Sequence, residues 1–416
     1  MKNLQSLITL AVALSGIAFA TPVVEERAPS KNVTSISTTN PFTGFEFFVS
    51  PVYREEILNA SSQLSHSGNT TLAKQALTVA TKISTFLWIS DTATISKVPS
   101  WLKEAQKIQK ATRKKQVVQI QIYNLPERDC SAKASAGELS YADGGEAKYQ
   151  AFILSIAAEL KKFPDVRIVL ALETDAIGNL VTNLAVPKCG DAAEAQKRSM
   201  AFAIANLQLP NVSLYVDGAH AGWLGYVTLS PLQDLSDPSF IDGLEQNLGP
   251  AADVITEIIA MAKAINPNAV VRGVATNISN YNGLGNNNQT GMDELVYVRN
   301  LQPLLAAKGF DAHFIVDQGR SGTQNYTREG TDWCNNKFAG FGPRPTTNTP
   351  DPLIDAVVWA KPGGECDGTS DTTAARFDEG CVSPNSLIPA PESGTWFQAY
   401  FVQLLTKANP PIPALY

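Results

Sequence analysis

Histidine and cysteine are scarce in this sequence, and their placement argues against a metal centre. The three histidines, His66, His220 and His313, lie far apart, and none belongs to a Cys/His cluster with the spacing of a zinc site. We therefore expect no metal ion and no other cofactor.

Basic residues are also fewer than acidic residues in this sequence. The chain has 33 Lys and Arg against 39 Asp and Glu, a net charge of −6, and its pI is near 5.3. These values argue against nucleic acid or an anionic membrane as a partner.

The apolar run over residues 7–19 is too short to span a membrane with a stop-transfer flank. It follows Lys2 and ends in Ala18-Phe19-Ala20, a small-x-small cleavage pattern. Residues 1–20 are therefore predicted to be a secretory signal peptide, and residues 21–41 a short pro-segment and polar lead-in with a possible cut after Arg27.

Secretion sets expectations for two kinds of side chain. Five cysteines in an oxidising compartment suggest two disulfides and one spare thiol. Glycosylation is expected at some of the Asn-x-Ser/Thr triplets, which begin at Asn32, Asn59, Asn69, Asn211, Asn277, Asn288 and Asn325.

Residues 42–416 are predicted to form one domain, because no second long linker interrupts them. Apolar strand-like runs recur at residues 45–49, 85–89, 117–123, 168–172, 212–216, 270–275, 313–316 and 356–360. Helix-like stretches lie between most of them, for example at residues 99–111, 146–162, 192–206, 250–265 and 294–308. This alternation predicts an α/β fold with parallel strands, and seven or eight units point to a β/α barrel.

Several predicted strands end in polar or aromatic residues, which would converge on the C-terminal mouth of a barrel. These residues are Trp88, Asp91, Tyr123, Asp175, Asp217, Asn277, Asp317 and Lys361. Individually each could be a loop or cap residue, and it is their repetition that favours a site.

The stretch of residues 168–183 carries the strongest signal. A buried-strand pattern, Ile-Val-Leu-Ala-Leu, runs directly into Glu173-Thr174-Asp175. A carboxylate at such a strand end sits where barrel enzymes keep their chemistry, so Asp175 is the candidate catalytic acid. The alternative is that Asp175 only caps the helix that follows.

Two loops and three tryptophans complete the pattern. The loops cover residues 126–145, with Cys130 and several glycines, and residues 361–381, rich in Lys, carboxylates and glycines. Trp88, Trp223 and Trp333 stand beside polar or glycine-containing segments, where flat rings suit sugar faces. Trp359 and Trp396 are expected to pack in the core.

The chain resembles glycoside hydrolase family 6, within it the fungal cellobiohydrolase II group, from about residue 42 to the C-terminus. The matching segments are residues 123–130 (YNLPERDC), 142–145 (ADGG), 173–175 (ETD), 179–183 (NLVTN), 217–225 (DGAHAGWLG), 275–277 (ATN), 280–283 (NYNG), 317–322 (DQGRSG) and 361–368 (KPGGECDG).

The resemblance implies a distorted barrel of about seven parallel strands and a tunnel roofed by two loops. It implies a cellulase that releases cellobiose from non-reducing ends of β-1,4-glucan with inversion. Cellulose and cello-oligosaccharides would be its partners, and a monomer is expected. It also implies the disulfides Cys130–Cys189 and Cys334–Cys381, with Cys366 free.

The resemblance assigns roles to individual residues. Asp175 matches the general acid, Asp129 the carboxylate that steers its protonation and Asp367 a candidate base, while Tyr123 and Ser135 match positions near the distorted sugar and the attacking water. The substrate-binding candidates are Trp88, Asp91, Asp217, His220, Trp223, Tyr226, Asn277, Trp333, Lys361 and Glu365.

The chemistry agrees with these roles. An inverting glycosidase needs a protonated acid on one side of the bond and a base-activated water on the other. An Asp stays protonated near neutral pH when it is desolvated or faces a like charge, and Asp129 could supply that charge.

Three departures from the family and two competing readings remain. Thr174 replaces a Pro, which could loosen the turn that presents Asp175, while Tyr226 and Leu284 replace aromatic residues. No cellulose-binding module is recognised.

The main alternative function is that of an endo-acting glucanase of the same family, although both roof loops are long. A lesser alternative is an inactive glucan-binding protein, which is disfavoured because Asp175, Asp129 and Asp367 are all present.

Overall fold

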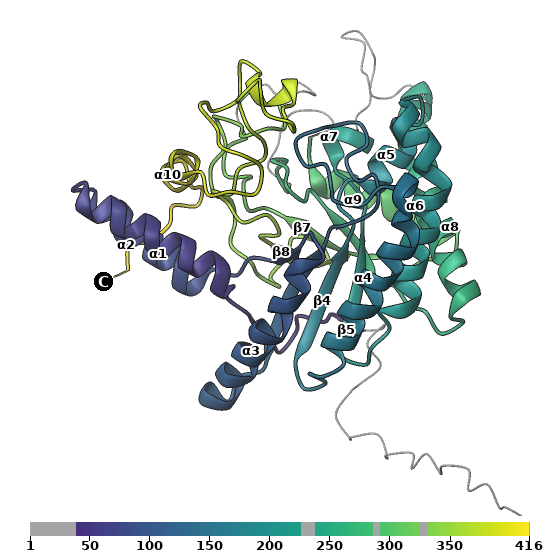
Figure 1. Cartoon of the computed structure of the whole chain (residues 1–416), viewed down its shortest axis with the longest axis horizontal. Coiled ribbons are helices and arrows are strands. Elements are labelled where there is room, and N and C mark those ends of the chain that lie inside the picture. The colour runs from purple at the N-terminus through teal and green to yellow at the C-terminus, as the bar shows by residue number, and fades with distance from the viewer. Residues whose placement is uncertain (1–38, 226–237, 286–291, 325, 327–331, 416) are drawn as a thin grey trace, which may run out of the picture. The chain divides into compact units, whose positions relative to one another are not determined.

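A computed structural model describes residues 39–225, 238–285, 292–324, 326 and 332–415, with side chains of α8 described from Asn247 onward. A parallel sheet lies at the centre of this part of the chain (Figure 1). Its strands are β1 (Glu46–Phe47), β2 (Leu87–Ile89), β3 (Gln116–Ile122), β4 (Arg167–Leu172), β5 (Val212–Asp217), β6 (Gly273–Thr276), β7 (His313–Asp317) and β8 (Ile354–Val358). All eight overlap the predicted strand-like runs.

The strand order is β1-β3-β4-β5-β6-β7-β8, and every pair is parallel. β2 also pairs with β3, further along the strand than β1 does, so the two short strands share one edge. Between β2 and β8 the contact is slight: the Phe86 N–H donates to the Trp359 carbonyl at 3.2 Å. The prediction of a distorted barrel with about seven parallel strands is confirmed.

The helices are α1 (Pro51–His66), α2 (Thr70–Lys82), α3 (Val98–Thr112), α4 (Gly145–Leu160), α5 (Ala176–Thr182), α6 (Pro187–Asn206), α7 (Ala221–Leu224), α8 (Pro238–Ile265), α9 (Glu294–Ala307) and α10 (Gln398–Thr406). Short 3₁₀ turns are η1 (Ala93–Lys97), η2 (Tyr141–Asp143) and η3 (Glu379–Val382). The predicted helix at residues 250–265 starts earlier than expected, because Pro250 lies inside α8 instead of in its first turn.

Two apolar layers arise from the alternation of side chains along the strands. Ile120 and Ile122 of β3 belong to the large outer core, which also contains residues of α3, α4, α6, α8 and α9. Val117 of β3 packs on the other side, with Val169 of β4 and Tyr215 of β5, in the interior of the barrel.

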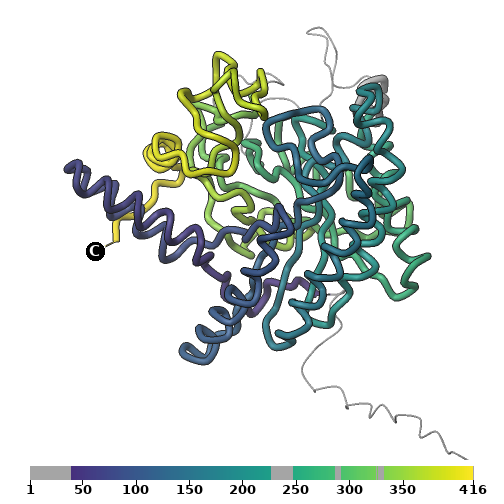
Figure 2. Tube along the Cα trace, viewed as in Figure 1, coloured from purple at the N-terminus to yellow at the C-terminus, as the bar shows by residue number. Residues whose placement is uncertain are grey.

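A further cluster joins α1, α2 and α10, which lie side by side at one flank (Figure 2). Ile57, Val79 and Phe401 are buried in it, together with Trp359 and the free thiol of Cys366. This packing supports the segment that follows β8. Trp359 is confirmed as a core residue, and Trp396 packs against the same cluster.

Two disulfides secure the loops that follow strands. Cys130 of the loop after β3 is bonded to Cys189 of α6, and Cys334 is bonded to Cys381 of η3. Cys366 is free and buried. The pairing implied by the family resemblance is therefore the one in the structure.

No helix among the described residues has both the length and the apolar character needed to cross a bilayer. The predicted signal peptide and most of the lead-in, residues 1–38, and Tyr226 lie outside the described residues.

Candidate active site

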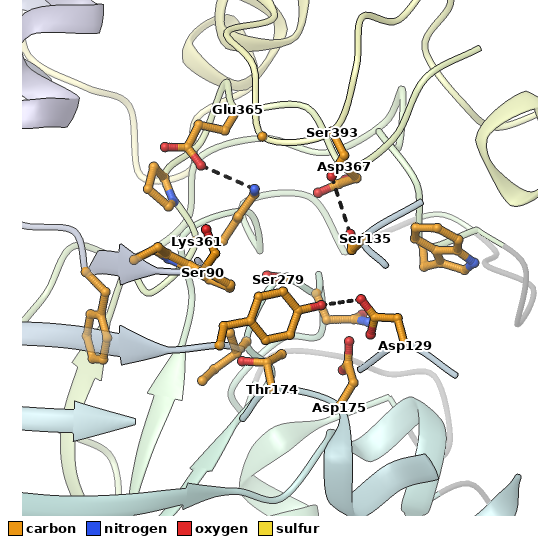
Figure 3. A pocket seen from close by; sticks show the side chains of 18 of the residues that line it. Ser90, Asp129, Ser135, Thr174, Asp175, Ser279, Lys361, Glu365, Asp367 and Ser393 are labelled. Carbon is orange, nitrogen blue, oxygen red and sulfur yellow. Dashed lines mark hydrogen bonds and ion pairs between the residues drawn. The ribbon is translucent and has the colours of Figure 1, made fainter. Parts of the chain in front are cut away.

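A cavity of about 820 Å³ opens at the C-terminal ends of the strands. It brings together most of the predicted site residues (Figure 3). Those that line it are Trp88, Tyr123, Asp129, Ser135, Asp175, His220, Trp223, Trp333, Lys361, Glu365 and Asp367.

Asp175 stands just before α5, in the N-cap position, yet its side chain makes no capping hydrogen bond. It is partly exposed and lines the cavity instead. The alternative that Asp175 serves only as a helix cap therefore does not hold.

The turn that presents Asp175 is held by its neighbours. Glu173 and Asp175 both have left-handed backbone angles, φ 54° and 69°, on either side of Thr174. The Asp175 N–H donates to Asp217 Oδ1 at 3.0 Å. Residues in this strained conformation persist only where the surroundings fix them, and they gather at functional sites.

The charges around Asp175 favour its protonated form. Loss of solvent, followed by the negative charges of Asp129 and Asp217, raises the pKa of Asp175 well above its usual range. Burial raises the pKa of Asp129 to about 6, against the opposing effects of Tyr123 and Arg128. Burial likewise raises the pKa of Asp217 to about 7, against two backbone N–H donors. A carboxyl group that is protonated near neutral pH is what a general acid requires.

Asp129 is fixed by the loop that follows β3. The Tyr123 hydroxyl donates a short hydrogen bond to Asp129 Oδ2. The guanidinium of Arg128 lies 4.2 Å from the centre of the Tyr123 ring and donates to the Ser135 carbonyl at 2.9 Å. Tyr123 and Ser135 are thereby tied to the same loop as Asp129.

Glu173 anchors this loop from below the cavity. Its carboxylate accepts from the N–H groups of Asn124 at 3.1 Å and Leu125 at 2.9 Å, and from the Tyr149 hydroxyl at 2.6 Å. The family motif contained Glu173, but no local pattern in the sequence indicates what it binds.

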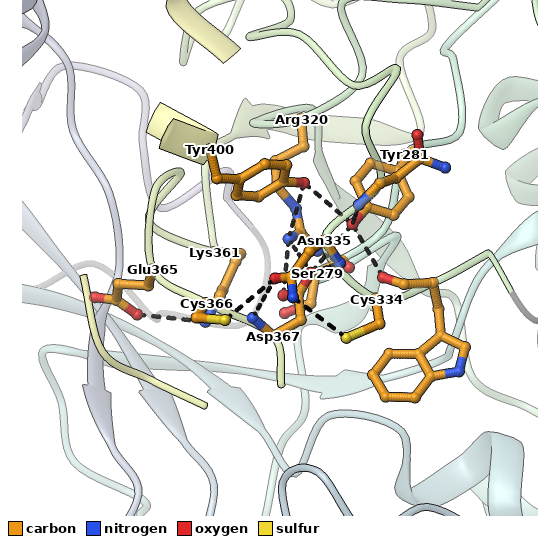
Figure 4. Close-up of polar contacts among 12 residues, drawn as sticks. Ser279, Tyr281, Arg320, Cys334, Asn335, Lys361, Glu365, Cys366, Asp367 and Tyr400 are labelled. Atoms are coloured by element: carbon orange, nitrogen blue, oxygen red, sulfur yellow. Dashed lines mark hydrogen bonds and ion pairs between the residues drawn. The ribbon is translucent and has the colours of Figure 1, made fainter. Parts of the chain in front are cut away.

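Asp367 occupies a different environment, on the opposite side of the cavity from Asp175 in Figure 3. Arg320 donates to both of its oxygens, at 2.8 and 2.7 Å, and this guanidinium is only 1% exposed. Oδ2 also accepts from the Asn335 N–H at 2.9 Å and the Tyr281 hydroxyl at 3.1 Å (Figure 4). Arg320 and Tyr281 were part of the family motifs but were not singled out, because their partner lies far away in the sequence.

One end of the cavity is formed by Trp88, Lys361 and Glu365. Lys361 Nζ lies 3.3 Å from Glu365 Oε2 and 5.6 Å from the centre of the Trp88 ring. Trp88 Nε1 donates to the Ala360 carbonyl at 2.8 Å. Glu56 of α1, a residue that the sequence did not reveal, also lines this end, and burial together with the charge of Glu365 raises its pKa to about 8.

His220, Trp223 and Trp333 also line the cavity. Trp223 lies over α5, where it leaves no room for a larger residue at Gly178, and its Nε1 donates to Thr182 Oγ1 at 2.8 Å. Its ring centre is 6.0 Å from that of His220. Aromatic faces in a polar cavity suit the two faces of sugar rings.

The two roof loops touch each other. The Lys133 N–H donates to Asp378 Oδ2 at 2.8 Å, and the Ser135 and Ser393 hydroxyls are 3.4 Å apart. Asp378 and Ser393 both line the cavity. The segments after β3 and after β8 thus meet above it.

Three predicted substrate-binding residues do not line the cavity. Asp91 accepts from the N–H and hydroxyl of Thr94, which is a local capping role. Asp217 is 1% exposed and supports Asp175 from behind. Asn277 is fully buried and donates to the carbonyls of Asn282 and Asp317. Their place at strand ends was predicted correctly, but their side chains bind other parts of the protein.

Of the two other family departures, Leu284 packs against the outer core and does not line the cavity. Tyr226 lies outside the described residues, so its predicted contact with sugar stays a prediction.

Comparison with known proteins gives a consistent result. The family model for glycosyl hydrolases family 6 matches residues 42–408. Exoglucanase 3 of Agaricus bisporus is 45% identical over 381 residues, 89% of this chain and 79% of that protein. A probable 1,4-beta-D-glucan cellobiohydrolase C of Aspergillus niger is 42% identical over 390 residues, 92% of this chain and 80% of that protein. The structure of cellobiohydrolase II (Cel6A) of Humicola insolens in complex with glucose and cellotetraose superposes with a TM-score of 0.80 at 41% identity, covering 90% of this chain and all of that one.

Proposed function

The chain belongs to glycoside hydrolase family 6, and from this membership we propose that it is a cellobiohydrolase acting on the β-1,4-glucosidic bonds of cellulose. We propose that it releases cellobiose from non-reducing chain ends and inverts the anomeric configuration. Relatives named exoglucanase and cellobiohydrolase support the activity, and a related structure that holds cellotetraose supports cello-oligosaccharides as the bound substrates.

The observation that carries the mechanism is the environment of Asp175. It lies in the cavity wall, where loss of solvent and the charges of Asp129 and Asp217 raise its pKa. In the proposed reaction the Asp175 carboxyl gives its proton to the glycosidic oxygen as the bond to the anomeric carbon breaks. A water molecule attacks that carbon from the opposite face, which inverts it.

Asp129 and Asp217 serve Asp175 in this proposal. Their charges keep its proton in place, and Asp217 also binds its backbone. Tyr123 and Ser135 share the loop of Asp129 and line the cavity, so we place them beside the sugar that is cleaved and the attacking water.

Asp367 is the proposed carboxylate on the side of the water. Inverting enzymes separate the two carboxyl groups by roughly 6.5–9.5 Å, so that a water fits between one of them and the sugar. Arg320, Asn335 and Tyr281 donate to Asp367 and hold its carboxylate in place. We therefore assign it the binding and orientation of the water, with transfer of the proton as its secondary role.

Contact between the roof loops favours exo action over endo action. A closed roof lets a chain end thread through but hinders binding in the middle of a chain. Lys133 with Asp378 and Ser135 with Ser393 form this contact. Breaking it with Asp378→Ala and Ser393→Ala together should raise the viscosity loss of carboxymethylcellulose per reducing end released.

The experiment that tests the function is the product profile on cellohexaose. Cellobiose and cellotetraose as the early products, without cellotriose, support release of disaccharides from a chain end. Cellotriose as a major early product would identify the endo-acting alternative. No products with correctly folded protein would leave only a glucan-binding role.

We further propose that the protein is secreted as a monomer, loses residues 1–20 and carries N-linked glycans. Asn59 and Asn69 are exposed on α1 and in the turn before α2. Asn211 and Asn277 are buried and hydrogen-bonded, so a folded molecule has no space for a glycan there. Mass spectrometry of the protein secreted by a fungal host should find glycans among these four only at Asn59 or Asn69, and the same sample gives the mature N-terminus.

A further inference from the structure

Glu294, the first residue of α9, is buried away from the cavity. Its side chain is 0% exposed, and it does not belong to the cavity wall. Burial of a carboxylate is costly unless hydrogen bonds replace the lost water. The groups that bind Glu294 therefore indicate what the protein uses it for.

Two hydrogen bonds to Glu294 come from the neighbourhood of His220. Oε1 accepts from Asn282 Nδ2 at 2.7 Å and from the Ala221 N–H at 2.8 Å. The same Asn282 nitrogen lies 3.2 Å from His220 Nδ1. Glu294 Oε1 therefore binds both the backbone of Ala221, which follows His220, and the Asn282 amide that lies beside the His220 ring.

Ala221 also begins α7, the short helix that carries Trp223. Its N–H is one of the donors that a helix start leaves without an internal partner, and Glu294 satisfies it. His220 and Trp223 line the cavity, and Trp223 lies over α5, which starts directly after Asp175. Since the proposed acid protonates the leaving oxygen, this part of the cavity holds the leaving-group sugars.

We propose that Glu294 is a positioning residue that holds His220 and Trp223 in place for the sugars on the leaving-group side. This inference rests on the proposed function. It assigns no contact with substrate to Glu294 itself, which acts through Asn282 and through the start of α7.

Glu294 has a counterpart on the other side of Asp175. Glu173 is also buried, 1% exposed, and its carboxylate binds backbone N–H groups of a loop that lines the cavity. That loop carries Tyr123 and Asp129, which belong to the centre where the bond breaks. The two glutamates therefore provide a matched pair of variants, one for each part of the cavity.

The charged surroundings of Glu294 favour a neutral replacement as a control. The titratable groups facing it are Asp217 from β5, Asp293 and Tyr297 from α9, and His220 through Asn282. None of these forms an ion pair with it among the described residues. Burial raises the pKa of Glu294 to about 7. Glu294→Gln keeps an oxygen for both donors and should preserve the geometry.

The test compares kcat/KM on cellotetraose with that on β-cellobiosyl fluoride. The fluoride places no sugar on the leaving-group side, because its leaving group is a small ion. Glu294→Ala should lose about 10- to 100-fold on cellotetraose, since small misplacements of binding groups have effects of this size. It should lose less than about twofold on the fluoride, and Glu294→Gln should stay within about threefold of the wild type on both.

Glu173→Ala should fall on both substrates alike, which calibrates the comparison. Equal losses of Glu294→Ala on the two substrates, or no loss on cellotetraose, would overturn the inference. If Glu294→Ala does not fold, Glu294→Asp provides the test, because its shorter side chain withdraws the oxygen by one methylene. Glu294→Asp must then lose activity on cellotetraose but not on the fluoride. A wild-type protein inactive on both substrates would instead reject the proposed function.

Discussion

The two walls of the cavity treat their carboxyl groups in opposite ways. On the wall formed by the ends of β3, β4 and β5, loss of solvent and the charges of Asp129 and Asp217 raise the pKa of Asp175. On the wall that follows β8, Asp367 is paired with the buried guanidinium of Arg320, at 2.7 Å. One wall favours a bound proton, whereas the other holds a carboxylate paired with a buried guanidinium.

This difference explains how two aspartates in one cavity can perform different tasks. Environment, not residue type, decides whether a carboxyl group donates a proton or stays ionised. An inverting hydrolase needs one group of each kind, on opposite faces of the sugar. The predictions below test the two walls separately, from the largest expected effect to the smallest.

Removal of the acid should have the largest effect. Asp175→Ala should reduce kcat on cellotetraose by about 10²- to 10⁴-fold, the usual contribution of general acid catalysis. β-Cellobiosyl fluoride should be cleaved at close to the wild-type rate, because fluoride leaves without a proton. Steady-state kinetics on both substrates measure the contrast, and equal losses on both would contradict the assignment of Asp175 as the acid.

Changes on the two walls should have opposite effects on stability. Arg320→Ala leaves Asp367 buried without its cation and should lower the free energy of unfolding by about 3–5 kcal/mol. Asp175→Asn removes a carboxyl group that the folded protein must keep protonated at pH 7 and should leave stability unchanged or raise it by up to about 2 kcal/mol. Urea unfolding at pH 7 measures both variants, and a change of the same sign in both would break the comparison.

Glu56 and Glu365 form a third pair of carboxyl groups in the cavity. A change of Glu56 should have the smallest effect on stability. Burial and the charge of Glu365 raise the pKa of Glu56 to about 8, from an ordinary value of 4.5 in the unfolded chain. The folded protein therefore binds this proton more tightly, and the stability that the proton confers is present below pH 4.5 and is lost as the pH rises through 8. Glu56→Gln should flatten the fall in Tm between pH 5 and pH 9 by on the order of a few °C.

The matched control for this prediction is Glu46→Gln, a change of the same kind at an exposed glutamate paired with Lys114. It should leave the pH dependence of Tm as in the wild type. An unchanged pH dependence in Glu56→Gln would show that Glu56 does not bind a proton in this pH range.

Local patterns in the sequence predicted the strands and the position of Asp175. Apolar runs mark buried parallel strands, and the residue that follows such a run must lie at the mouth. The same logic placed Asp217 and Asn277 at the mouth but could not say which way their side chains turn. That direction depends on backbone angles at the strand ends, such as φ 55° at Ala219, and on partners from other strands.

The contacts that distinguish the two walls were beyond the reach of the sequence. Arg320 and Asp367 are separated by 47 positions, and Glu294 reaches Ala221 across 73. Glu56 enters the cavity only because α1 packs against the segment after β8, where the Tyr53 hydroxyl donates to the Gly363 carbonyl. Pairings of this kind depend on tertiary packing, which local periodicity does not encode.

The central claim, that an acid and a water-binding carboxylate act from opposite walls, is tested most directly by the configuration of the first product. Proton NMR of cellotetraose during the first minutes of hydrolysis follows the anomer of the newly formed reducing end before it equilibrates. The arrangement of Asp175 and Asp367 predicts α-cellobiose as that first product. Initial formation of the β-anomer would mean retention through a covalent intermediate and would contradict the assignment of the two walls.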